Sequence, residues 1–338
     1  MKRLIDLVCA SVLMACALVA PAHADPAWDQ VIADAKREGK LVIYVGGGEN
    51  ALKPVSERFE QRYGITVTHL SGRASEIRER IRTEQSTGRI GGDLTWTGAS
   101  TAAPQIAEGV FQSPGALPNQ QKLTPLFRGL DPVVPAFVNR FAMLVNTSLV
   151  PPGEEPKSWF DLLAPKWVGK ILSDDPRAAG GGLAAFAALS NVFGREFHEK
   201  LAAQKPVLSR DFLVSQRRIA AGEFPIYIPF SVANIIDLPG LPVKPVVPQE
   251  GAAYSTSMTA ILKGARNPNA ARLFLDFVLE DVNQAFFENH GWGTVTGVVA
   301  PDLPKALQPI ASSKLLGTLD PKQQPNMLKM FTEIYQTP

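Results

Sequence analysis

The strongest constraint on the fold is an alternation of short apolar strands and amphipathic helices between residues 40 and 101. Strands are predicted in KLVIYVGGG, ITVTHLSG and GGDLTWTGAS, with helices in ALKPVSERFEQRYG and ASEIRERIRTEQSTG between them. This order and spacing imply a parallel sheet with right-handed crossovers. After a proline-rich connection, the strand AFVNRFAMLVN opens a second α/β run.

The length of 338 residues exceeds what one hydrophobic core usually supports, so two domains are expected. Each α/β run stops and restarts near residues 135–138 and again near residues 255–260. We therefore predict that the chain crosses between its two lobes at these places.

The N-terminus has the features of a secretory signal peptide. Lys2 and Arg3 precede the apolar run LVCASVLMACALVA, and the small residues Ala22 and Ala24 flank His23. We expect residues 1–24 to be removed and the mature chain to lie in the bacterial periplasm. The alternative is a lipoprotein with its lipid on Cys16.

Composition excludes several classes of function. Cys9 and Cys16 both lie in the predicted signal peptide, so disulfides and thiolate nucleophiles are excluded from the mature chain. The formal charge of +2 gives no indication of nucleic-acid binding. His69, His198 and His290 are scattered, and the common catalytic motifs are absent. We expect a protein that is not an enzyme, with a secreted hydrolase as the alternative.

The loops after the predicted parallel strands are candidates for ligand binding. In open α/β sheets, ligands bind outside the carboxyl ends of the strands, where loops lead into helix N-termini. The loops at 46–50, 71–75 and 97–101 are rich in glycine and hydroxyl groups. Their candidate ligand-binding residues are Gly47, Gly48, Glu49, Ser71, Arg73, Thr97 and Ser100. Ordinary turn and cap chemistry is the alternative explanation.

The order of five segments resembles the periplasmic solute-binding proteins of ABC importers. These segments are YVGGGEN, SGRASEIRERIRTEQSTGRIGGDLTWTG, SWFDLLAPKWVGKILSDDP, AAGEFPIYIPF and RNPNAARLFLDFVLE. The chain is most similar to the group that includes ferric-ion, phosphonate and sugar-phosphate binders. The likeness covers nearly all of the predicted mature chain.

This resemblance implies a type II-like fold in which two α/β lobes, each a mostly parallel sheet flanked by helices, are joined by a hinge of two crossing strands. A ligand would lie in the cleft between the lobes, and the lobes would close on it. We expect lobe 1 to contain residues 25–136 and 256–305, and lobe 2 residues 137–255 and 306–338. The implied partners are a small solute and an inner-membrane ABC permease, with no cofactor, metal or nucleic acid. We expect a monomer.

The residues that replace a tyrosine pair bear on the class of ligand. Ferric-ion binders of this group carry two adjacent tyrosines after a Gly-Glu, whereas Phe230 and Ser231 stand at the similar place in GEFPIYIPFSVAN. Tyr227 and Tyr254 remain as candidate ligand-binding residues, together with Ser231. A ferric-ion binder is therefore the alternative to the anion binder that we favour.

Three consecutive glycines at 180–182 precede a predicted helix in SDDPRAAGGGLAAFAAL. Three glycines weaken the start of a helix, so they need a reason. In sugar-phosphate and phosphonate binders the similar loop presents backbone N–H groups to a phosphoryl group. We therefore expect Gly180 and Gly181 to admit an anion, with Arg177 adding a charged contact. The alternative is that the glycines permit close packing of the helix.

The signal-peptide prediction has a direct test. N-terminal sequencing of the exported protein should begin at Asp25, because Ala22 and Ala24 occupy the small-residue positions of a cleavage site. A diacylglycerol-modified Cys16 would contradict this result.

Overall fold

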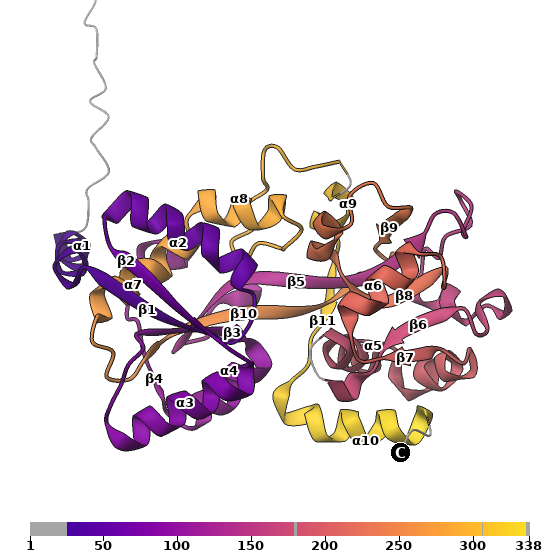
Figure 1. Ribbon diagram of the computed structural model, residues 1–338, viewed down its shortest axis with the longest axis horizontal. Coiled ribbons are helices and arrows are strands. Elements are labelled where there is room, and N and C mark those ends of the chain that lie inside the picture. The colour runs from indigo at the N-terminus through magenta and orange to yellow at the C-terminus, as the bar shows by residue number, and fades with distance from the viewer. Residues whose placement is uncertain (1–25, 179–180, 306, 336–338) are drawn as a thin grey trace, which may run out of the picture.

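The computed structural model of the chain describes residues 26–178, 181–305 and 307–335. Figure 1 shows two α/β lobes, with strands β5 (Val133–Asn146) and β10 (Ala252–Leu262) running between them. One sheet continues through both lobes in the order β2-β1-β3-β10-β5-β8-β6-β7. The predicted fold class is confirmed, with two mostly parallel α/β lobes and a hinge of two crossing strands.

Lobe 1 is built on the parallel strands predicted first from the sequence. β1 pairs in parallel with β2 on one side and with β3 on the other. The elements of this lobe are α1 (Pro26–Glu38), β1 (Lys40–Val45), α2 (Glu49–Tyr63), β2 (Thr66–Ser71), α3 (Ala74–Thr87), β3 (Leu94–Gly98), α4 (Ala99–Ala107), β4 (Phe111–Gln112), α7 (Pro268–Val278) and α8 (Asp281–Asn289). As expected, glycines end α2 and α3, since Gly64 and Gly88 both adopt the left-handed conformation at φ 68°.

Lobe 2 repeats this plan on a smaller sheet. β6 pairs in parallel with β7 and β8. The elements of this lobe are β6 (Ile171–Asp174), α5 (Gly181–Ala203), β7 (Val207–Ser209), α6 (Phe212–Ala220), β8 (Ile226–Ser231), β9 (Val243–Val246), α9 (Gln308–Ala311), β11 (Leu315–Gly317) and α10 (Gln324–Tyr335). The helix predicted after the three glycines therefore begins at Gly181.

The hinge is the antiparallel pair β5 and β10. At its lobe 1 end, Ser257 of β10 pairs with Gly98 of β3. At its lobe 2 end, Phe141 of β5 pairs with Ser231 of β8. The two crossing strands include the residues where crossings were expected, while the exact residue boundaries of the two lobes stay a prediction.

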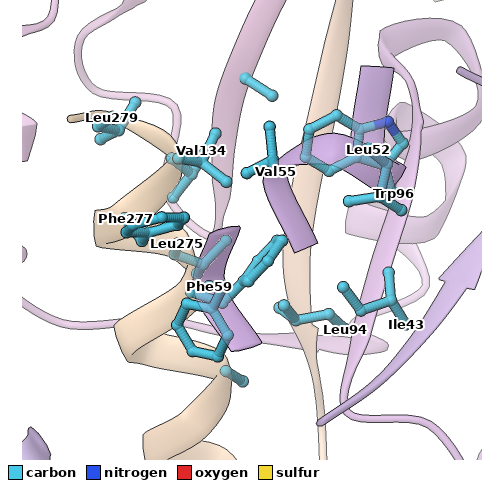
Figure 2. Packing of buried hydrophobic residues seen from close by; sticks show 14 of the residues in the cluster. Ile43, Leu52, Val55, Phe59, Leu94, Trp96, Val134, Leu275, Phe277 and Leu279 are labelled. Atoms are coloured by element: carbon cyan, nitrogen blue, oxygen red, sulfur yellow. The ribbon is translucent and has the colours of Figure 1, made fainter. Parts of the chain in front are cut away.

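The core of lobe 1 holds α2 and α7 against the sheet. Figure 2 shows Phe59 of α2 between the residues of α7 and the strand residues Ile43 and Leu94. The rings of Phe59 and Phe277 lie 5.4 Å apart, edge to face. Phe59 is completely buried and thereby attaches α2 to this core. Among the helices described, none has the length and apolar composition needed to cross a membrane.

Candidate functional site

One face of the hinge carries a row of small polar side chains. The pairs Phe137–Ser257, Asn139–Ser255 and Phe141–Ala253 are directly opposed in the β5/β10 ladder. Opposed residues, and every second residue along a strand, share a face. Ser231 joins them from β8, where its hydroxyl donates to Oδ1 of Asn139 over 2.8 Å. We call the four partly exposed residues of this face the hinge floor, namely Asn139, Ser231, Ser255 and Ser257.

Helix α5 begins over the lobe 2 end of this face. A β carbon placed on Gly181 would lie 2.7 Å from Cε1 of Phe141. Ala184, Ala185 and Ala188 of α5 form a buried cluster with Phe141 and Ala253. The helix therefore runs from the hinge into lobe 2, and its N-terminus lies next to the Asn139–Ser255 pair.

Helix α2 begins over the lobe 1 end of the same face. Its N-cap, Gly48, is left-handed at φ 73° and makes no side-chain cap hydrogen bond. A β carbon on Gly48 would lie 3.6 Å from Cζ of Phe137 and 3.3 Å from Nε1 of Trp96. The helix thus runs from the hinge into lobe 1.

Two helix N-termini therefore approach the hinge floor, one from each lobe. Phe137 and Phe141 are four residues apart on β5, which is about 13 Å of extended strand. Each helix N-terminus carries about half a positive charge and several N–H groups without intrahelical acceptors. The hinge floor between them is uncharged. This arrangement suits a small molecule that is negatively charged and rich in hydrogen-bond acceptors.

The three loops predicted from the sequence meet at one edge of the lobe 1 sheet. A β carbon on Gly46 would lie 3.0 Å from Oγ1 of Thr97 and 3.2 Å from Cα of Ala74. Gly47, Gly48 and Glu49 follow in the first loop and are exposed. Thr97 is buried, and its hydroxyl has no hydrogen-bond partner in the described part of the chain.

Of the remaining lobe 1 candidates, Ser71 and Arg73 lie at the outer part of this edge, whereas Ser100 follows β3, the strand next to the hinge. Ser71 ends β2, the edge strand, and is exposed. The side chain of Arg73 is 86% exposed and lies 3.7 Å from the Glu76 carboxylate. Ser100 is exposed in the first turn of α4. The structure thus brings the 46–50 loop and Thr97 closest to the hinge, whereas Ser71 lies two strands away from β3.

The two candidate tyrosines point away from the hinge floor. Tyr254 pairs with Arg140 and packs in the lobe 1 core, on the face opposite to its neighbour Ser255. Tyr227 is buried, and its hydroxyl donates to Oδ1 of Asp174 over 2.7 Å. Neither tyrosine ring lies over the hinge floor, whereas the third candidate from this region, Ser231, is part of it.

Arg177 is held by a carboxylate of its own turn. Its Nε and Nη2 atoms each lie 2.9 Å from an oxygen of Asp175, and its guanidinium lies over the ring of Phe331. Burial alone would raise the pKa of Asp175, but the hydrogen bonds from Arg177 hold it below its usual value. A direct contact between Arg177 and a ligand stays a prediction. Gly180 lies outside the described residues.

Sequence analysis missed Asn139, Ser255 and Ser257. Their signal was present as small polar residues at every second position of YSTS and as the single asparagine in FVNRF. The alternation indicates that one face of each strand is not packed in a core. It does not indicate which residues of the two strands lie opposite each other.

The packing of Gly181 leads to a stability prediction. Gly181→Ala should lower the free energy of unfolding by about 1–3 kcal/mol, because the new methyl group would overlap the ring of Phe141. Thermal and urea unfolding would measure the change. In a Phe141→Leu background the same substitution should cost clearly less, and an equal cost in both backgrounds would contradict the packing explanation.

The partly buried carboxyl of Asp174, beside this turn, leads to a prediction about pH. Burial raises the pKa of Asp174 to about 6, although the hydrogen bond from Tyr227 opposes the shift. A raised pKa stabilises the folded state below pH 4, and this contribution is lost as the pH rises through 6. Asp174→Asn removes this titration. Between pH 4 and pH 8, the variant should therefore lose up to about 3 kcal/mol less of its unfolding free energy than the wild type loses. Urea unfolding of both proteins at the two pH values measures this, and parallel profiles would contradict it.

Comparison with known proteins places the chain among extracellular binding proteins. The family model for "bacterial extracellular solute-binding protein" matches residues 41–293. An uncharacterized protein of Haemophilus influenzae is 25% identical over 294 residues, which are 82% of this chain and 84% of that protein.

Solved structures with a similar fold bind different ligands. The periplasmic binding protein AfuA of Actinobacillus pleuropneumoniae, solved with fructose-6-phosphate bound, is 22% identical with a TM-score of 0.69, covering 89% of this chain and 99% of that one. Iron-bound HitA of Pseudomonas aeruginosa is 18% identical with a TM-score of 0.70, covering 87% of this chain and 99% of that one. At these identities the likeness concerns the fold alone.

Proposed function

Since the chain belongs to the bacterial extracellular solute-binding proteins, we propose that it captures a small anionic solute, a phosphate ester or a phosphonate, between its lobes. It is a periplasmic solute-binding component of an ABC transporter and not an enzyme, which removes the hydrolase alternative. In this proposal a monomer carries the solute to an inner-membrane permease, after export by a cleaved signal peptide.

The observation that carries the proposal is the approach of two helix N-termini to an uncharged floor. The first turn of α5 contains no acidic residue of its own, and Gly181 and Gly182 have no side chains, although the Asp174 side chain packs against Gly182. Backbone N–H groups at such a helix start hold phosphoryl oxygens well. Asn139 and Ser255 add hydrogen-bonding groups on the same face, two residues along each strand from Phe141 and Ala253, which contact this helix. The fructose-6-phosphate bound by AfuA is a ligand of this chemical class.

The ferric-ion alternative has less support from the side chains. Ferric ion requires hard anionic ligands such as phenolate or carboxylate. Tyr227 and Tyr254 point away from the hinge floor, and Phe230 is completely buried. Among the described residues, no three His, Asp or Glu side chains lie together in a way that could hold a metal ion. Added ferric citrate should therefore produce no phenolate charge-transfer band.

The hinge floor provides the test of the proposal. Isothermal titration of the mature protein with fructose 6-phosphate and with inorganic phosphate should show binding of at least one of them. Asn139→Asp should weaken that binding more than tenfold, because it keeps the size of the side chain but places a negative charge beside the anion. The Ser231 hydroxyl can still donate to the new carboxylate, so the fold should be preserved.

Tyr254→Phe is the matched control on the same pair of strands. Its hydroxyl is on the core side of β10, so affinity should not change. Unchanged affinity in Asn139→Asp, with binding intact in the wild type, would overturn the assignment of the hinge floor as the binding site.

A further inference from the structure

The N-terminus of α2 has donors that no described group accepts. Gly46 donates its N–H to Trp96, and the N–H groups of Ala51 and Leu52 bond back to Gly48. Within the described ranges, no acceptor is found for the N–H groups of Glu49 and Asn50, and Gly48 provides no side-chain cap. These residues are exposed, so their N–H groups are open to a ligand.

A buried indole nitrogen points toward the same helix start. Trp96 is completely buried, and its Nε1 has no hydrogen-bond partner in the part of the chain that the structure describes. A β carbon on Gly48 would lie 3.3 Å from Nε1 but 4.0 Å from Cδ1, so the nitrogen edge of the ring faces Gly48. A buried donor without an acceptor destabilises the folded protein. An acceptor oxygen brought by a ligand would remove this cost.

We propose that lobe 1 holds a second oxyanion at the N-terminus of α2, with Trp96 Nε1 as one of its donors. The inference rests on the proposed function, which places a phosphoryl or phosphonyl group at the N-terminus of α5. The ligand is then a phosphate ester with a carboxylate at its other end. Gly47 and Gly48, at φ 142° and 73°, have no side chains, and the proposal requires their backbone to shift so that an oxygen reaches the indole.

The spacing of the two helix starts sets the length of this ligand. About 13 Å of strand separates the residues under the two N-termini. If this strand length is taken as the separation of the donors, a hydrogen bond of about 2.9 Å at each end leaves roughly 7 Å between the outermost oxygens of the ligand. A phosphoryl group and a carboxylate joined through a three-carbon chain span this distance.

Two charged residues flank the proposed oxyanion site at the N-terminus of α2, which we call the second seat. Glu49 is exposed at the first position of α2, where its charge opposes a second anion. Arg73 follows the neighbouring strand, next to Ala74, whose Cα lies 3.2 Å from the β carbon position of Gly46. Because the Arg73 side chain is 86% exposed, it can move toward a carboxylate held at Gly47 and Gly48.

The test compares two probes that share a phosphoryl group and a three-carbon chain. 3-Phosphoglycerate ends in a carboxylate, whereas glycerol 3-phosphate ends in a hydroxymethyl group. In isothermal titration of the mature protein, we expect 3-phosphoglycerate to bind at least tenfold more tightly. Trp96→Phe, which removes the N–H and keeps an aromatic ring, should bring this ratio toward one without weakening glycerol 3-phosphate.

Trp167→Phe is the matched control. Trp167 is also buried with an unpartnered Nε1, but it lies in the lobe 2 core, so the ratio should not change. Glu49→Gln tests the seat without touching the core. At low salt it should tighten 3-phosphoglycerate several-fold, and glycerol 3-phosphate less, because the phosphoryl group lies farther from residue 49 than the carboxylate does.

The outcomes separate this inference from the proposed function. Equal affinity for the two probes in the wild type would overturn the second seat while supporting an anion binder. An unchanged ratio in Trp96→Phe, or weaker 3-phosphoglycerate binding in Glu49→Gln, would also overturn it. A further outcome is that none of the four compounds binds, namely 3-phosphoglycerate, glycerol 3-phosphate, fructose 6-phosphate and inorganic phosphate. In that case the anion proposal is wrong, and the second oxyanion site is wrong with it.

Discussion

The antiparallel pairing of β5 with β10 decides what the rest of the molecule can do. Its register places Asn139 opposite Ser255 and, on the other face, Arg140 opposite Tyr254. A shift of one residue in either strand would exchange the faces, burying the hydroxyls and exposing the tyrosine. Both lobes are attached to this pair through β3 and β8. The two strands are therefore at once the mechanical link between the lobes and the polar surface beneath the candidate site.

Glycines let both helices start close to this pair. Gly181 leaves room for Phe141, and Gly48 leaves room for the nitrogen edge of Trp96. Close packing and access for a ligand were treated as alternatives for the glycines at 180–182. The structure shows close packing of Gly181 against the Phe141 ring, and in the proposed function the same missing side chain lets an anion approach the backbone N–H groups. The two explanations are therefore compatible, because both follow from the absence of a β carbon.

Local patterns in the sequence predicted the elements but not their faces. The strand and helix order, the capping Gly64 and Gly88, and the start of α5 at Gly181 all follow from periodicity and glycine chemistry. The position of Tyr254 does not, because it depends on the register between strands more than one hundred residues apart. The sequence also did not indicate that Arg177 is hydrogen-bonded to Asp175, two residues before it, over 2.9 Å. Composition alone does not show which carboxylate of the chain an arginine side chain will contact.

Dividing the donors between two lobes has a consequence for transport. An anion at one helix N-terminus gains about 0.3–1 kcal/mol when exposed and up to about 2 kcal/mol when partly buried. In this proposal the ligand is held at α5, and the contact at the start of α2 adds to its affinity for the form in which both helix starts face the ligand. A ligand shifts a conformational equilibrium only by its difference in affinity for the two states. In this proposal, a second contact of about 1–2 kcal/mol favours closure roughly five- to thirtyfold. In this proposal the contact at α2 is lost when the lobes separate. Because the hinge floor carries no charge, the anion then leaves without breaking an ion pair to the floor.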